Sequence, residues 1–203
     1  MTALPNRDRR AERREATRRE ILDAAWEIAR RDGITAITLR EIAGRIGMRP
    51  PSLYSHFDSK NAVYDAMFAE SWRDVSQTFE EMQQPTAPRE ALLAEAELWF
   101  EFATADLARH QLMNQRVMHD FEPSPEAYAE AVTCYRRLEE AMRAKGVRKE
   151  VDLDLWTSLL AGVINQQEAN DPGGKRWRRQ LPRIVDMFAD EVGIPGPALR
   201  RTR

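Results

Sequence analysis

The sequence predicts an all-α protein with about nine helices. Along most of the chain, apolar residues recur at the three- and four-residue spacing that places them on one face of a helix. Residues that cap helix starts precede several of these segments, and glycine follows several of them. Proline also stands at positions suited to a first helical turn, as at Pro50, Pro51 and Pro125.

Three short helices are expected between residues 17 and 59. The first two each begin at a threonine followed three residues later by glutamate, a spacing in which the two side chains cap backbone N–H groups reciprocally. A glycine ends each of them, and a proline pair begins the third. These signals stand at Thr17 with Glu20, Gly33, Thr38 with Glu41, Gly47, and Pro50 with Pro51. The expected helices cover about 18–31, 39–46 and 50–57.

The third of these helices has little apolar surface. Leu53 and Phe57 lie four residues apart and are expected to hold one side to the core. The other side is rich in hydrogen-bond donors and free of acid before Asp58, which suits a helix in a major groove. We predict base-edge or near-base contacts by Arg49, Ser52 and His56, phosphate contacts by Thr38, Tyr54 and Lys60, and a further DNA contact by Ser55 on the same side. The alternatives are that Thr38 is only a cap, that Tyr54 packs on the next helix, and that Lys60 is only solvated.

This segment resembles a known motif. The run Ile37–Ala43, Gly47, and Leu53–Phe57 with Lys60 is similar to the helix-turn-helix of the TetR/AcrR family of transcriptional regulators, and the similarity spans roughly residues 17–70. The resemblance implies a dimer with an N-terminal three-helix DNA-binding domain and a larger helical domain that binds an effector and dimerises. Pro50 departs from the family pattern, so the resemblance implies no particular base preference.

Charge is distributed unevenly along the chain. The 203 residues have a formal net charge of −2, but residues 1–60 hold 13 Lys and Arg against 9 Asp and Glu, whereas residues 61–203 hold 18 against 24. The basic part attracts phosphate, and the acidic remainder limits non-specific binding to DNA. The single cysteine, Cys134, excludes an intramolecular disulfide. Because no apolar run approaches the ~20 residues of a membrane span, we expect a soluble, cytoplasmic protein.

A domain plan follows from these features. Residues 1–16 carry many arginines and almost no large apolar side chain, so we expect a flexible basic arm that either touches DNA or is only solvated. Residues 17–59 are expected to form the DNA-binding domain, and a helix over 60–83 links it to an effector-binding and dimerisation domain over 60–194. Residues 195–203 are expected to form a tail. Further helices are expected over 89–109, 112–118, 125–145, 151–168 and 177–192, with a kink or a late start at Pro182.

Two surfaces are expected in the second domain. Its methionines and aromatic residues suit an adaptable apolar effector cavity, although each is otherwise a core residue. The expected cavity residues are Trp99, Phe102, Met113, Met118, Phe121, Tyr128, Tyr135 and Trp156. The last two long helices have more apolar surface than one core uses, which favours a symmetric four-helix contact between two copies. The expected interface residues are Leu155, Leu159, Val163, Trp177, Leu181, Ile184, Val185 and Phe188.

No motif for catalysis is present. The sequence lacks a glycine-rich phosphate loop, a nucleophile elbow and paired cysteines, so we expect no enzymatic activity, no cofactor and no metal. The favoured hypothesis is a homodimeric repressor that binds a palindromic double-stranded DNA operator and is released by a largely apolar small-molecule effector. The alternatives are a DNA-binding dimer without a ligand switch and a small helical enzyme. The effector, the operator and the choice between repression and activation stay open.

Overall fold

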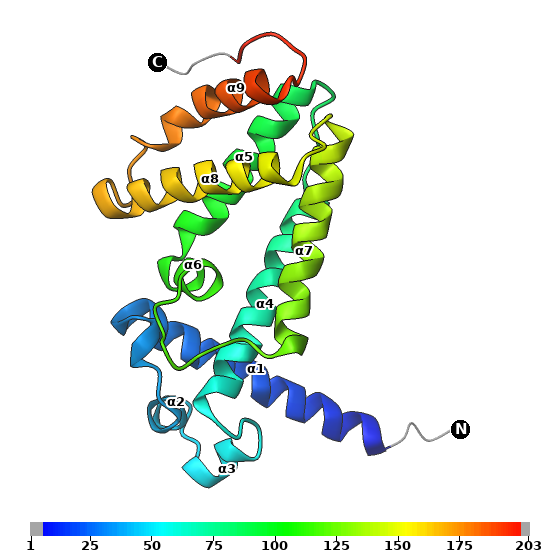
Figure 1. The fold of residues 1–203 in the computed structure, drawn as a ribbon. Helices are drawn as coiled ribbons and strands as arrows, with labels where there is room; N and C mark the ends of the chain where they lie inside the picture. The colour runs from blue at the N-terminus through cyan, green and yellow to red at the C-terminus, as the bar shows by residue number, and fades with distance from the viewer. Residues whose placement is uncertain (1–5, 200–203) are drawn as a thin grey trace. The chain divides into compact units, whose positions relative to one another are not determined.

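The structure, a computed structural model, describes residues 6–199 and is built from helices (Figure 1). These residues form nine α-helices, two 3-10 helices and no strand, which confirms the predicted all-α class. The α-helices are α1 (Asn6–Asp32), α2 (Leu39–Arg45), α3 (Pro50–Tyr54), α4 (Lys60–Glu81), α5 (Pro88–Ala105), α6 (Leu107–Asn114), α7 (Pro125–Ala144), α8 (Glu150–Asn170) and α9 (Leu181–Val192). The 3-10 helices are η1 (Ile34–Ala36) and η2 (Arg178–Gln180).

The chain folds into two compact units. The first unit comprises Met1–Ser71 and Gln111–Tyr128, and the second unit comprises Trp72–His110 and Ala129–Arg203. Helix α4 therefore contributes its first half to the first unit and its second half to the second unit. This division differs from the boundary expected at residue 59, because the start of α4 and the segment Gln111–Tyr128 pack with the first three helices.

One face of each N-terminal helix forms the core of the first unit. The Tyr64 hydroxyl of α4 donates a hydrogen bond to the Ile34 carbonyl at 2.8 Å, and burial raises the pKa of Tyr64 to about 12. Of the apolar residues on the faces of α1 to α4, Leu39 and Ile46 are only half-buried. Fully buried members are Ile21, Ala25, Ile28, Ile42, Leu53, Phe57, Val63 and Met67.

Helix α1 begins earlier than the sequence indicated. Residues 6–16, expected to form a flexible arm, belong to α1, and residues 1–5 lie outside the described part of the chain. Thr17 is therefore inside a helix and not at its start, and its hydroxyl donates to the Arg13 carbonyl at 3.0 Å. A threonine hydroxyl inside a helix can donate a hydrogen bond to the carbonyl one turn earlier. The spacing of Thr17 and Glu20 therefore did not mark the start of a helix.

The second unit is centred on α5, α8 and α9. Trp156 of α8 packs on Phe188 of α9 with ring centroids 4.9 Å apart, and both side chains are buried. The helix expected over 89–109 is divided at Asp106, whose carboxylate accepts the Arg109 N–H at 3.1 Å and so begins α6. Pro182 stands in the first turn of α9, so the predicted late start is correct and no kink results.

A buried polar cluster fastens the C-terminal segment of the second unit. The Arg89 guanidinium on α5 contacts the Asp186 carboxylate at 3.4 Å, the Asp190 carboxylate at 2.6 Å and the Ile194 carbonyl at 3.0 Å. Asp186 in turn accepts the Leu199 N–H at 3.0 Å. The expected tail is therefore packed as far as Leu199, and residues 200–203 lie outside the described part. None of the described helices is both long enough and apolar enough to cross a membrane.

Candidate nucleic-acid interface

Helix α2 and the turn after it form as the sequence predicted. The Thr38 hydroxyl accepts the Glu41 N–H at 3.1 Å and caps the helix at Leu39. The Glu41 carboxylate, however, accepts from the Arg31 guanidinium at 2.8 Å, so it pairs with α1 in place of closing the expected capping box. Gly47 takes φ of 66°, a left-handed conformation that ends α2 and lets the chain turn at once into α3.

Helix α3 is anchored from behind by two side chains. Leu53 is fully buried and Phe57 is 2% exposed. The regular helix ends at Tyr54, earlier than expected, but the Phe57 N–H still donates to the Leu53 carbonyl at 3.0 Å and keeps the two side chains on one side. A five-residue helix contributes little stability of its own, so these anchors hold it in place.

Most of the predicted DNA contacts lie on the free side of this motif. Tyr54 is 54% exposed. His56 is half-buried, and its Nδ1 is buried without a hydrogen-bond partner among the described residues, so only Nε2 is available for contact. The fully exposed members of the predicted set are Thr38, Arg49, Ser52, Tyr54, Ser55 and Lys60.

Arg18 fixes the end of this motif, a role that sequence reasoning missed. Its guanidinium donates to the His56 carbonyl at 2.6 Å and lies 4.1 Å from the centre of the Phe57 ring. Arg18 stands three residues before Ile21 and seven residues before Ala25, and both of these are buried. This spacing places Arg18 on the buried face of α1, and an arginine on such a face is the sequence signal that could have revealed its role.

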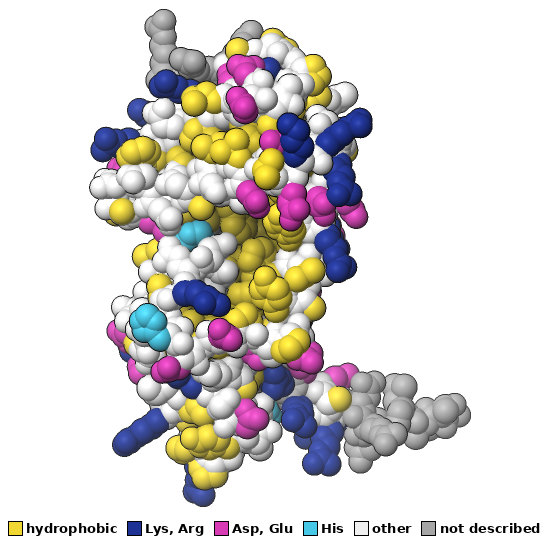
Figure 2. All heavy atoms as spheres, viewed as in Figure 1, with side chains coloured by type: hydrophobic (Ala, Val, Ile, Leu, Met, Phe, Trp, Pro, Cys, Tyr) yellow, Lys and Arg dark blue, Asp and Glu magenta, His cyan; other side chains and the backbone are white. Residues whose placement is uncertain are grey.

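Lys60 begins α4 beside the motif. The Ser59 hydroxyl accepts the Ala62 N–H at 3.1 Å and caps this helix. The Lys60 ammonium is exposed and lies 5.4 Å from the centre of the Tyr64 ring. Basic side chains gather at the end of the first unit where α2 and α3 lie (Figure 2).

A loop between α6 and α7 covers the start of α4. The Asn61 side-chain amide donates to the Asp120 carbonyl at 3.0 Å, and the Asp65 carboxylate accepts the Ser124 N–H at 2.8 Å. The Tyr64 and Phe121 rings lie 5.3 Å apart. A shallow cavity of about 240 Å³ between these elements is lined by Thr35, Lys60, Asn61, Tyr64, Val117, Met118, His119, Asp120 and Phe121.

The eight expected cavity residues do not form one group. Met113, Met118, Phe121 and Tyr128 belong to the first unit, whereas Trp99, Phe102, Tyr135 and Trp156 belong to the second. In the second unit, Trp99 and Phe102 stack together with centroids 6.1 Å apart. Trp156 is 1% exposed and is a core residue, while Tyr135 is 41% exposed.

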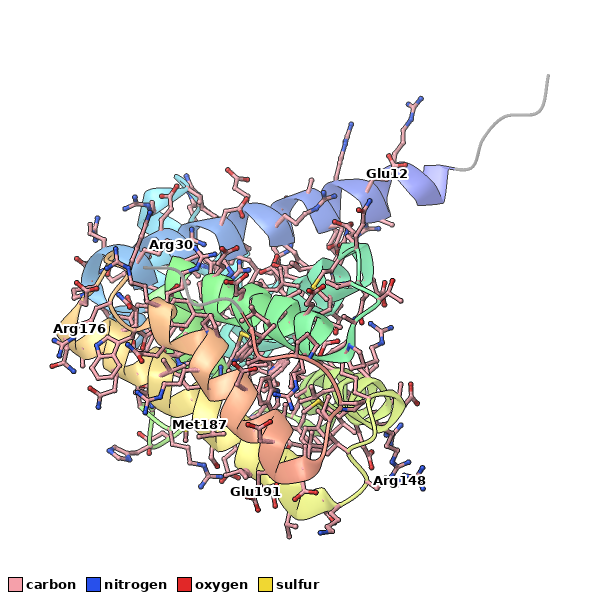
Figure 3. All side chains as sticks on the ribbon, turned by 90° about the horizontal axis from the view of Figure 1, so that it is seen from above. Glu12, Arg30, Arg148, Arg176, Met187 and Glu191 are labelled. Carbon is pink, nitrogen blue, oxygen red and sulfur yellow. The ribbon has the colours of Figure 1, made fainter. Side chains whose placement is uncertain are left out.

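The residues expected at an interface between copies also divide into two sets. Val163, Leu181, Val185 and Phe188 are buried within the core of the second unit and so offer no free surface. Leu159, Trp177 and Ile184 are half-buried, and Leu155 is 40% exposed. Met187, which is not in the expected set, is 61% exposed and lies with Glu191 on the outer surface of α9 (Figure 3).

Titratable side chains do not converge on a metal-binding arrangement. In the part of the chain that the structure describes, no three His, Cys, Asp or Glu side chains are placed to hold a metal ion. Cys134 is half-buried, and burial raises the pKa of its thiol. His110 of α6 is 4% exposed.

Comparison with known proteins finds a family match in the N-terminal helices just described. Residues 21–67 fit the family model described as "Bacterial regulatory proteins, tetR family". This match assigns the N-terminal helices, residues 21–67, to the tetR family of bacterial regulatory proteins. The class D tetracycline repressor of Escherichia coli is 38% identical over 53 residues, which is 26% of this chain and 24% of that protein. The transcriptional activator FasR of Mycolicibacterium smegmatis is 31% identical over 118 residues, which is 58% of this chain and 52% of that protein.

The structural similarity extends further along the chain. A tetR-family regulatory protein from Rhodococcus RHA1 superposes with a TM-score of 0.63 over 88% of this chain and 98% of that one, at 20% identity. At this identity the likeness establishes a shared TetR-family fold. The chain spans about half or less of the length of the curated relatives it matches.

The role of Arg18 predicts a difference between two neighbouring arginines. Arg18→Ala removes the hydrogen bond to the His56 carbonyl and the contact with Phe57, so it should lower the free energy of unfolding by about 1–3 kcal/mol. Arg19→Ala removes the same charge from an exposed position and should change stability by less than about 0.5 kcal/mol. Urea denaturation of both variants measures this, and equal stabilities would contradict the role given to Arg18.

Proposed function

We propose that the protein is a homodimeric regulator of transcription that binds double-stranded DNA through α3 and responds to a small molecule. The observation that carries this proposal is the free side of α3, where Arg49 and Ser52 are exposed while Leu53 and Phe57 hold the helix from behind. A short helix that presents donors beside a basic surface suits a major groove. The family match over residues 21–67 supports the same interpretation.

The exposed side chains divide into two roles by reach and chemistry. Arg49 and Ser52 read base edges, because they stand at the start and on the outer side of the groove-facing helix. Tyr54 and Lys60 contact phosphates beside it, and the Thr38 hydroxyl does so while capping α2. His56 contributes through Nε2, since Nδ1 is buried.

The first turns of α1 add a second basic element. The chain is helical here, and the side chains of residues 9–16 are exposed. They include Arg9, Arg10, Arg13 and Arg14 against two acids, Glu12 and Glu15. These arginines strengthen binding by attraction to phosphates flanking the α3 contact.

Dimerisation through α8 and α9 makes the DNA contact symmetric. Leu155, Ile184 and Met187 are among the apolar side chains that these helices leave exposed or half-buried after the core of the second unit is filled. A pair of chains related by a two-fold axis presents two copies of α3, which requires a palindromic operator with half-sites about one turn, 34–36 Å, apart. Leu181, Val185 and Phe188 pack into the core of the second unit and so hold α9 in position.

The regulator represses transcription in the cytoplasm, and an effector bound in the second unit releases it from DNA. Tetracycline repressor is named for repression, whereas FasR is named as an activator, so activation is the alternative direction. A ligand that favours one dimer arrangement weakens operator binding by its coupling free energy, typically ~1–3 kcal/mol. A reporter gene behind the selected operator decides the direction: expression that rises on deletion of the regulator supports repression, and expression that falls supports activation.

The division of roles predicts two kinds of DNA-binding defect. Lys60→Ala and Tyr54→Ala should weaken binding to all sequences, and Lys60→Ala should reduce the slope of log K against log salt by about 1. Arg49→Ala should relax sequence preference and cost about 1–3 kcal/mol at the selected site only. Fluorescence anisotropy with selected and scrambled duplexes measures both effects. The control is Lys175→Ala, which removes an exposed lysine of the second unit and should leave DNA binding unchanged. Unaltered DNA binding by the Lys60, Tyr54 and Arg49 variants would refute the assignment of these residues to DNA contact.

The interface assignment predicts the effect of a charge on α9. Met187→Glu should shift the protein from dimer to monomer and reduce operator affinity, because it buries a carboxylate between two apolar surfaces. Leu107→Glu, at an exposed apolar position on α6, should leave the dimer intact. Sedimentation equilibrium compares them, and a wild-type chain that sediments as a monomer would refute the dimer.

A further inference from the structure

The first unit contains a cavity of about 240 Å³ that no residue of α3 lines. Its walls come from η1, from the start of α4 and from the loop Val117–Phe121, all within the first unit. The Asn61 amide donates to the Asp120 carbonyl at 3.0 Å and so joins the loop to α4. Because an apolar cavity of ~150 Å³ can bind benzene, this volume admits a small molecule with one ring.

Two aromatic rings give the cavity an apolar corner. Tyr64 is 1% exposed, and its hydroxyl donates to the Ile34 carbonyl at 2.8 Å, so the ring is what it leaves for a ligand. The Tyr64 and Phe121 rings have centroids 5.3 Å apart and planes inclined at 58°. Val117 and Met118, both half-buried, extend the apolar lining. Such a corner suits a flat aromatic ring, which can stack on one side chain and meet the other edge-on.

Hydrogen-bond donors stand beside this corner. The Lys60 ammonium is exposed, lies 5.4 Å from the centre of the Tyr64 ring, and forms no ion pair with the described residues. Thr35 and His119 add an exposed hydroxyl and an exposed imidazole. Asp120 is the one acid among the lining residues. An ammonium without an ionic partner, next to an aromatic corner, suits a ligand that joins a ring to an anion.

We propose that this cavity binds a small aromatic carboxylate, whose ring packs against Tyr64 and Phe121 and whose carboxylate pairs with the Lys60 ammonium. The site is separate from the effector site proposed for the second unit, and ligand binding itself does not depend on the proposed function. Its consequence does depend on it. A bound carboxylate occupies the ammonium assigned to a DNA phosphate, so ligand and DNA compete for Lys60 and each weakens the other by the same factor.

Three probes with the same ring test the charge preference on the full-length chain. Benzoate is an anion at pH 7, benzyl alcohol is neutral and benzylamine is protonated. Ligand-observed NMR titrations at constant ionic strength should give benzoate a Kd on the order of 1 mM, at least about fivefold tighter than benzyl alcohol, with benzylamine the weakest. Equal binding of the three probes, tighter binding of benzylamine, or no binding would overturn the proposal.

Three variants locate the bound carboxylate. Lys60→Met keeps the apolar stem and removes the charge, so benzoate should bind it no more tightly than benzyl alcohol does. Asp120→Asn removes the opposing charge and should tighten benzoate binding by at least about twofold, a gain that misfolding cannot produce. Arg40→Met changes an exposed arginine of the first unit that does not line the cavity, and should bind all three probes as the wild type does. Benzoate binding unaltered by Lys60→Met would place the ligand elsewhere and overturn the proposal.

Fluorescence anisotropy with the selected duplex measures the competition. Benzoate at about ten times its Kd, compared with chloride at the same concentration, should weaken DNA binding of the wild type by nearly the factor that Lys60→Met costs. It should not weaken DNA binding of Lys60→Met further. Equal DNA affinity of the wild type in the two salts would overturn the competition. Failure of the wild type to bind any selected duplex would instead refute the proposed function, while the probe titrations would still decide the binding site.

Discussion

A helix of five residues depends on side chains that lie outside its own hydrogen bonds. Here α3 is held by Leu53 and Phe57, which are buried, and by Arg18, whose guanidinium extends from α1 to the His56 carbonyl. These contacts use one side of the helix and leave Arg49, Ser52 and Tyr54 in solvent. The exposed surface is therefore a consequence of how the helix is anchored, and its position follows from the packing of α1 and α4.

The segment Gln111–Tyr128 extends this dependence to a distant part of the sequence. It belongs to the first unit, and its contacts with Asn61, Tyr64 and Asp65 hold the first turns of α4, next to Lys60. Both α4 and α6 continue from the first unit into the second.

Local signals predicted the helices well, and long-range packing explains the differences. The caps at Thr38 and Ser59, the turn at Gly47 and the late start at Pro182 depend on neighbouring residues, so they were readable from the sequence. Helix periodicity could not decide which apolar residues of α9 face the chain's own core, and so Leu181, Val185 and Phe188, which are buried in that core, were expected at an interface. Buried polar groups such as His110 had no signal, because their burial depends on residues distant in the sequence.

Placing a cleavage reagent on α3 tests the central claim most directly. A chain with Cys134→Ser and Ser52→Cys, labelled with an iron chelate, should cut operator DNA around two positions related by a dyad and separated by about one helical turn. The same label at Lys175 should give no localised cutting. Uniform or absent cleavage from the Ser52 position, with operator binding retained, would contradict the placement of α3 in the groove.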